Sequence, residues 1–230
     1  MEEHLATAAD EGPAGATGAA APTEPRRERR MGEIVDTAAR LFATNGYAAT
    51  GVAELCEAVS LGRGALYYYI GSKEGLLVRI HDRVIDLLLQ RYHAIAAEGH
   101  APEERLRRLG AAMIETITTY PDHCFVFMHE WRSLSGEAAE RFRARRREVE
   151  QLVEGTLAEG VEQGVFRCAE LRIATLAWLA LHNYTYHWYR PGGRFDAATI
   201  AAAFHQIFCD GLRSGEAVDP AAAVARLASA

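Results

Sequence analysis

The chain of 230 residues lacks the marks of several protein classes. Its four cysteines are scattered and form no CxxC pair, so we expect reduced thiols rather than a disulfide framework. The longest apolar run, from Leu171 to Leu181, is shorter than the roughly 20 residues that span a bilayer. The N-terminus has no signal-peptide pattern. These absences predict a cytoplasmic protein without membrane contact.

The chain also lacks an excess of basic over acidic side chains. The formal net charge is −6, and Lys73 is the only lysine. Residues 26–86 carry nine basic and eight acidic side chains, a net charge of +1. A nucleic-acid-binding protein with so little positive charge must use a few focused contacts and helix N-termini rather than bulk attraction.

Helical periodicity is what the sequence does contain. Apolar residues recur at spacings of three and four from Arg26 onward, and no alternating strand pattern competes. The pattern predicts an all-α fold of about nine helices. The segment 171–189 is apolar almost all round, which predicts one helix buried on more than one side. The predicted boundaries are a stop at Asn45-Gly46, N-caps at Thr50 and Ser72, and a helix start at Pro102.

Residues 50–73, TGVAELCEAVSLGRGALYYYIGSK, are the most informative stretch. They predict two short helices joined by a turn, the second running from Arg63 to Tyr69. Three consecutive tyrosines on so short a helix cannot all face a core, so some must be exposed. Gly62 and Gly64 allow close backbone approach at the start of that helix. This pattern is typical of a helix-turn-helix, whose second helix enters the major groove of DNA.

Residues 27–86 resemble the DNA-binding domain of the TetR family of transcriptional regulators. The resemblance implies that Arg63, Ala65 and Tyr68 approach base edges. It also implies that a second set of residues holds phosphates: Thr50, Tyr67, Tyr69 and Lys73. The positions that carry the resemblance are Phe42, Gly46-Tyr47, Thr50, Gly64, Leu66-Tyr67, Tyr69 and Ser72-Lys73.

Three positions depart from the family pattern. Ser60 stands where glycine is usual in the turn, and we expect it to adopt a positive φ at a cost of roughly 1 kcal/mol. Gly62 replaces a common capping serine, and Ile70 replaces a common phenylalanine. Neither Ser60 nor Gly62 is expected to abolish the motif, because glycine is still an acceptable N-cap.

The resemblance further implies a helical C-terminal domain that binds a small-molecule effector and forms a homodimer. The last two helices carry apolar faces too wide for one chain to cover, which favours them as the dimer seam. Apolar and aromatic side chains in the middle of the chain could line an effector cavity. The candidates are Met113, Ile117, Phe125, Met128, Trp131, Phe142, Trp178 and His182.

An arginine-rich run, Arg141 to Arg147, has two interpretations. It is either a solvated helix face with Glu137–Arg141 and Arg146–Glu150 pairs, or an anion site in which Arg145 and Arg146 bind a CoA thioester. The segment NYTYHWYRPGGR, residues 183–194, is loosely similar to actinobacterial TetR-type repressors of steroid and fatty-acid catabolism, whose ligands are CoA thioesters. That similarity favours the anion-site interpretation only modestly over the solvated helix face.

The sequence therefore predicts a disordered tail (1–25), a helix-turn-helix domain (26–72), a helical effector and dimerisation domain (73–215) and a C-terminal tail (216–230). We expect a dimeric repressor of double-stranded DNA operators. No catalytic, cofactor or metal motif is recognisable, so neither enzymatic activity, nor a cofactor, nor a metal is expected. The alternatives are a ligand-binding or scaffolding module whose DNA-binding head has decayed, and a small helical enzyme.

Overall fold

The computed structural model describes residues 24–213, and between these residues it contains ten α-helices, one 3-10 turn and no strand. The all-α prediction is confirmed. Most of the two predicted tails lies outside the described residues, but Glu24 and Pro25 already belong to the first helix. The elements are α1 (Glu24–Asn45), α2 (Val52–Ala58), α3 (Arg63–Ile70), α4 (Lys73–Ala97), α5 (Pro102–Thr119), α6 (Pro121–His129), η1 (Trp131–Ser133), α7 (Gly136–Glu162), α8 (Leu171–Asn183), α9 (Thr185–Trp188) and α10 (Ala197–Arg213).

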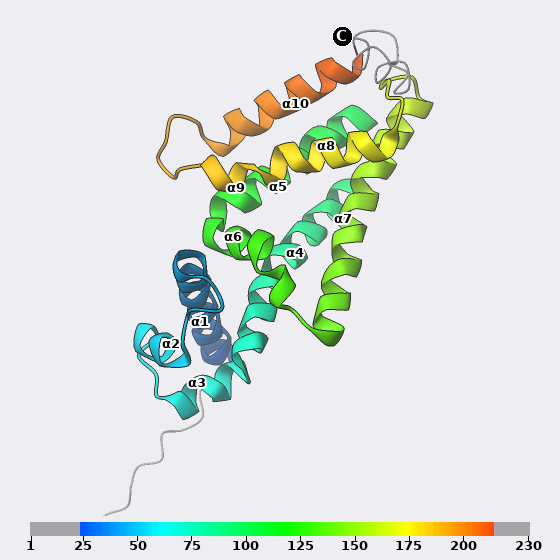
Figure 1. The fold of residues 1–230 in the computed structure, drawn as a ribbon. Helices are drawn as coiled ribbons and strands as arrows, with labels where there is room; N and C mark the ends of the chain where they lie inside the picture. Colours follow the sequence, from blue (N-terminus) through cyan, green and yellow to red (C-terminus); the bar gives the residue numbers. More distant parts are fainter. Residues whose placement is uncertain (1–23, 214–230) are drawn as a thin grey trace, which may run out of the picture.

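The first three helices and the start of α4 form a small head at one end of the molecule (Figure 1). Its core consists of side chains from all four helices, which water does not reach: Ile34, Phe42, Leu55, Leu66 and Leu76. The long helix α4 runs from this head into the larger helical part, where α5 packs against α4, α7, α8 and α10. A conformational change in the larger part can therefore reach the head along α4.

Two predicted caps have different outcomes. Ser72 caps α4 as predicted, because its Oγ accepts a hydrogen bond from the Gly75 N–H at 2.8 Å. The predicted cap at Thr50 is wrong, since α2 has Gly51 as its N-cap. The Thr50 hydroxyl turns inward and donates to the Gly46 carbonyl oxygen at 2.9 Å, so it closes the loop after α1 instead.

The predicted single helix over residues 171–189 is wrong in two respects. The chain breaks at Tyr184, so α8 and the short α9 replace it. One face of α8 buries Thr175, Trp178 and His182 against the rest of the chain, but the other exposes Ile173 (62%) and Leu176 (46%). The reason is that α8 lies at the edge of the molecule and packs mainly on α5 and α7.

Close packing between α5 and α8 depends on Gly110. A Cβ at this position would lie 2.7 Å from Nε2 of His182, which is too close for any side chain. Burial lowers the pKa of His182 to about 4. The imidazole is therefore neutral near pH 7 and packs against the Trp178 ring in a tilted arrangement, with ring centroids 4.0 Å apart. Within the described residues, no helix combines the length and apolar character needed to cross a membrane.

Candidate DNA interface and effector cavity

The helix α3 presents an exposed polar and aromatic surface at the tip of the head. Leu66 and Ile70, one turn apart, are buried and anchor the helix to the core. Tyr67 and Tyr68 are 38% and 61% exposed. Tyr69 is less exposed, since it is half-buried and packs against the core. The exposed tyrosines thus point outward, as the sequence predicts, together with the exposed Arg63, Gly64 and Ala65 at the start of the helix.

The turn before α3 has the predicted strain. Ser60 has φ of 52°, the only positive φ of a non-glycine residue in the described part of the chain. The Leu61 N–H donates to the Cys56 carbonyl oxygen at 2.9 Å, which closes the turn after α2. Gly62 is the N-cap of α3 and supplies no side-chain hydrogen bond. The N–H groups of the first turn of α3 are therefore left without a side-chain cap.

Lys73 contacts the loop between α1 and α2, and Thr50 lies within that loop, but the two side chains differ in their access to solvent. The Lys73 ammonium lies 4.4 Å from the centre of the Tyr47 ring and 3.5 Å from the Ala48 carbonyl oxygen, and its side chain is partly exposed. Thr50 has no exposed surface at all. The expectation that the Thr50 hydroxyl holds a phosphate disagrees with this geometry.

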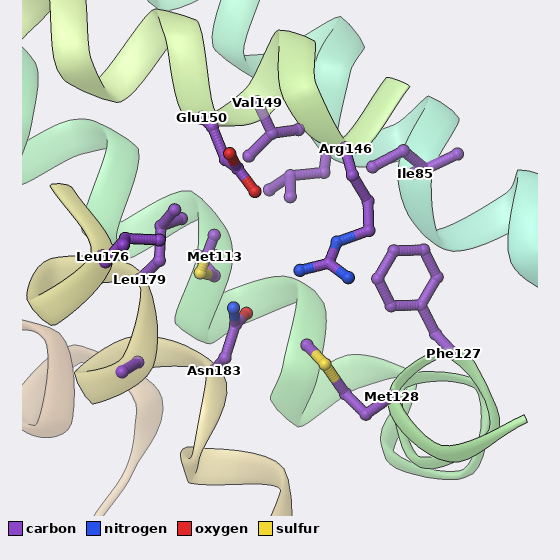
Figure 2. Close-up of a pocket in the computed structure, with 12 residues that line it drawn as sticks. Ile85, Met113, Phe127, Met128, Arg146, Val149, Glu150, Leu176, Leu179 and Asn183 are labelled. Atoms are coloured by element: carbon purple, nitrogen blue, oxygen red, sulfur yellow. The ribbon is translucent and has the colours of Figure 1, made fainter. Parts of the chain in front are cut away.

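A cavity of about 230 Å³ lies between α4, α5, α6, α7 and α8 (Figure 2). Its wall is mostly aliphatic, aromatic or thioether, with Arg146, Glu150 and Asn183 as polar groups. Figure 2 shows the Arg146 side chain running from α7 into the cavity, with its guanidinium near Phe127. The lining residues are Ile85, Leu88, Met113, Phe127, Met128, Arg146, Val149, Glu150, Leu176, Leu179, Ala180 and Asn183.

The structure separates the two arginines that the sequence groups together. Arg145 forms ion pairs with two carboxylates of α4, Asp82 at 3.1 Å and Asp86. Arg146 has no ion pair among the described residues, because its predicted partner Glu150 binds Arg172 of α8 at 2.7 Å. The predicted pair of Glu137 with Arg141 is also replaced, by Arg141 with Asp82. Only Arg146 is left to meet an anion in the cavity.

Three predicted effector residues line this cavity: Met113, Met128 and Arg146. The others lie elsewhere: Ile117, Phe142, Trp178 and His182 are buried in the core, Phe125 and Trp131 are half-buried, and Arg145 binds α4. Sequence reasoning missed the wall from α4 and α8, such as Ile85 and Leu179. Their heptad-like spacing identifies them only as helix core and does not tell which core residues border an empty space.

The helix α6 connects the cavity to the head. Phe127 and Met128 line the cavity, and Glu130, the C-cap of α6 two residues after Met128, reaches the loop after α1. The Glu130 carboxylate accepts a hydrogen bond from the Tyr47 N–H at 3.1 Å. Tyr47 in turn lies under the Lys73 ammonium. A shift of α6 would therefore disturb the loop that precedes the helix-turn-helix.

Reactive groups are not gathered into a further site within the described residues. No group of three or more His, Cys, Asp or Glu side chains there is arranged to hold a metal ion. Burial raises the pKa of the Cys124 thiol to about 12 and that of Cys209 to about 11. Both thiols are therefore protonated near pH 7 and are poor nucleophiles.

Two family models match these two parts of the chain. Residues 34–80 match the model described as bacterial regulatory proteins, tetR family, and residues 99–212 match the tetracyclin repressor-like C-terminal domain. The HTH-type transcriptional repressor KstR2 of Rhodococcus jostii is 33% identical over 194 residues, which cover 80% of this chain and 92% of that protein. The chain belongs to the TetR family.

Solved structures of TetR-family proteins share the whole arrangement. KstR2 of Mycobacterium tuberculosis, a ketosteroid transcriptional regulator, aligns with a TM-score of 0.77 and 26% identity over 81% of this chain and 96% of that one. AibR, solved in complex with isovaleryl coenzyme A and operator DNA, aligns with a TM-score of 0.70 and 27% identity over 77% and 97% of the two chains. As a TetR-family member related to steroid-catabolism repressors, this chain is a transcriptional regulator and not an enzyme.

Proposed function

We propose that this TetR-family regulator is a cytoplasmic homodimeric repressor that binds a palindromic operator and is released by a small-molecule effector. The observation that carries the proposal is α3, a short helix with exposed Arg63, Tyr67 and Tyr68 held by buried Leu66 and Ile70. A helix presented in this way fits the major groove. Similarity to a protein named as a repressor, over 80% of this chain and 92% of that protein, supports the direction of the regulation.

In this proposal the residues of the head divide into two groups. Arg63, Ala65 and Tyr68 meet base edges, because they lie on the exposed side of α3. Tyr67, Tyr69 and Lys73 meet phosphates and set the register of the helix on the duplex. Thr50 contributes by closing the loop after α1 with its hydroxyl, which donates to the Gly46 carbonyl oxygen, and does not itself hold a phosphate.

Lys73→Ala is expected to weaken operator binding on all sequences. The loss of one phosphate contact should flatten the slope of log K against log salt by up to about 1. Tyr67→Ala should weaken binding similarly but leave the slope nearly unchanged, and Tyr67→Phe isolates the hydroxyl. Fluorescence anisotropy at several salt concentrations, on DNA selected by the wild-type protein, gives both quantities. Wild-type affinity in both alanine variants would contradict these roles.

The dimer seam is proposed to be formed by α8 and α10. Both helices expose a large apolar side chain that a second copy would cover: Ile173, 62% exposed, on α8, and Ile207, 65% exposed, on α10. The opposite side of each of these two helices is already buried within the chain itself. A twofold contact between identical faces would give a dimer with two symmetry-related heads, which matches the two half-sites of a palindrome.

Ile207→Glu is expected to raise the dissociation constant of the dimer on the order of 100-fold or more, because each dimer would bury two unpaired carboxylates. Sedimentation velocity at micromolar protein measures the change in mass. Gln90→Glu adds the same charge on the exposed side of α4 and should leave the dimer intact. A fully dimeric Ile207→Glu protein would place the seam elsewhere.

The effector is proposed to combine an apolar group with an anionic one, as a CoA thioester does. The apolar wall of the cavity suits an acyl chain or a fused-ring fragment, and the free Arg146 suits a phosphate or carboxylate at its edge. The isovaleryl coenzyme A complex of AibR supports this class of ligand. An effector that prefers one position of α6 would act on the head through Glu130 and Tyr47.

The alternative, a ligand-binding or scaffolding module whose DNA-binding head has decayed, rests only on Ser60 and Gly62. Both are accommodated, since the turn closes and α3 still forms with Gly62 as its N-cap. Selection of genomic fragments by the purified protein tests the choice directly. Enrichment of one near-palindromic sequence is the expected result, and no enrichment would favour the binding module without a DNA target.

A further inference from the structure

The start of α1 carries an arginine cluster that the helix-turn-helix does not use. Residues 26–30 read RRERR, so four of the nine basic side chains of residues 26–86 are found within five positions. The matching TetR family model begins at residue 34, after this cluster. The cluster therefore lies outside the part of the head that matches the family model.

Contacts place this cluster beside the reading helix. The Arg27 guanidinium lies over the Tyr68 ring, 5.6 Å from its centre, and Tyr68 is the most exposed residue among the three tyrosines of α3. Arg30 donates a hydrogen bond to the carbonyl oxygen of Val59, in the turn before α3. Figure 1 shows the first turns of α1 at the same end of the molecule as α3.

The four arginines differ in how their charges are compensated. Arg27 pairs with Glu24 at 3.6 Å, and Arg30 pairs with Glu33 at 2.7 Å. Arg26 and Arg29 are exposed and have no ion pair or hydrogen bond among residues 24–213. Arg26, Arg29 and Arg30 follow the i, i+3, i+4 spacing of one helix side, and Arg30 shows that this side faces the turn before α3.

We propose that Arg26 and Arg29 bind DNA phosphates next to the groove that α3 enters, while Arg27 and Arg30 hold the start of α1 against the reading helix. This inference rests on the proposed operator binding. It explains how a head with a net charge of +1 holds a polyanion, because the uncompensated charge is concentrated at one edge of the DNA-facing surface. The contacts carry no sequence information and strengthen binding to all DNA.

The test compares the full-length protein with Arg26→Ala/Arg29→Ala on the DNA that the wild type selects. Two lost phosphate contacts per subunit should flatten the slope of log K against log salt by roughly 1.8 per subunit and weaken binding roughly tenfold or more near 0.1 M salt. Arg26→Lys/Arg29→Lys should restore most of both quantities, since charge alone is required. Arg143→Ala/Arg147→Ala removes the same charge from exposed positions of α7 and should change neither.

The outcomes separate this inference from the function on which it rests. If the wild type enriches no DNA, the proposed operator binding fails. If the wild type binds and Lys73→Ala flattens the salt slope, but the Arg26/Arg29 variant keeps the wild-type slope, only the arginine contact is overturned. Equal losses in the Arg143/Arg147 control would also overturn it, because the effect would then follow net charge and not position. Thermal unfolding of each variant shows that the head is still folded.

Discussion

Arg146→Ala is expected to weaken binding of an acyl-CoA about 10- to 100-fold, because hydrogen bonds to charged groups contribute about 1.5–3 kcal/mol. The guanidinium lies at the cavity, over the Phe142 ring with its carbon 5.9 Å from the ring centre, and has no carboxylate partner among the described residues. Isothermal titration with isovaleryl coenzyme A, the ligand of the structural neighbour AibR, measures the change.

The matched control is the adjacent residue. Arg145→Ala removes the same side chain from the same helix, but the Arg145 guanidinium is already bound to Asp82 and Asp86 on α4. Its loss should leave acyl-CoA affinity within about threefold of wild type and cost at most about 1 kcal/mol of stability, since the pair is partly exposed. If acyl-CoA affinity falls equally in both variants, the run from Arg141 to Arg147 is a solvated helix face and not an anion site.

Trp178→Ala is expected to lower the free energy of unfolding by about 3–5 kcal/mol. The indole is 1% exposed and fills the space between α5 and α8, where it packs against His182 and faces Gly110. Removing it leaves a cavity that the close contact of these two helices cannot fill. Urea denaturation followed by circular dichroism, at a fixed protein concentration, measures the loss.

Trp188 provides the comparison for this prediction. It lies on the short α9 and is 38% exposed, so Trp188→Ala removes an equally large side chain from a half-solvated position. We expect less than half of the loss seen for Trp178. Similar losses in the two variants would contradict the prediction, because the burial of the removed side chain would then not set the loss of stability.

The helix-turn-helix could be predicted from sequence because it is a local structure. Its helices, its Ser72 cap and the positive φ of Ser60 depend on residues within about five positions of one another. The exposure of Tyr67 and Tyr68 follows from the same reasoning, because a helix of eight residues buries one side and Leu66 and Ile70 occupy it. Thr50 was misjudged because its partner, the Gly46 carbonyl, competes with the helix N-terminus for the hydroxyl.

The cavity and its charges could not be predicted in the same way. Arg145 and Arg146 are neighbours in sequence, and their difference arises from Asp82 and Asp86, about 60 positions earlier, and from Arg172, which takes Glu150. Local pairing rules predicted i,i+4 partners that the folded chain replaces with partners on other helices. Such choices depend on which helices pack side by side.

By itself, the sequence determined the helical class, the helix-turn-helix, its exposed tyrosines and the family resemblance, since these depend on periodicity and on residues close along the chain. Only the tertiary structure decided that α8 is exposed on one side, that Arg146 and not Arg145 meets the cavity, and that Arg27 lies over Tyr68. Each of these is set by contacts between residues far apart in sequence. Helical periodicity indicates whether one face of a helix is apolar or charged. The packing of the helices determines which face another helix covers and which charged side chain is left without a partner.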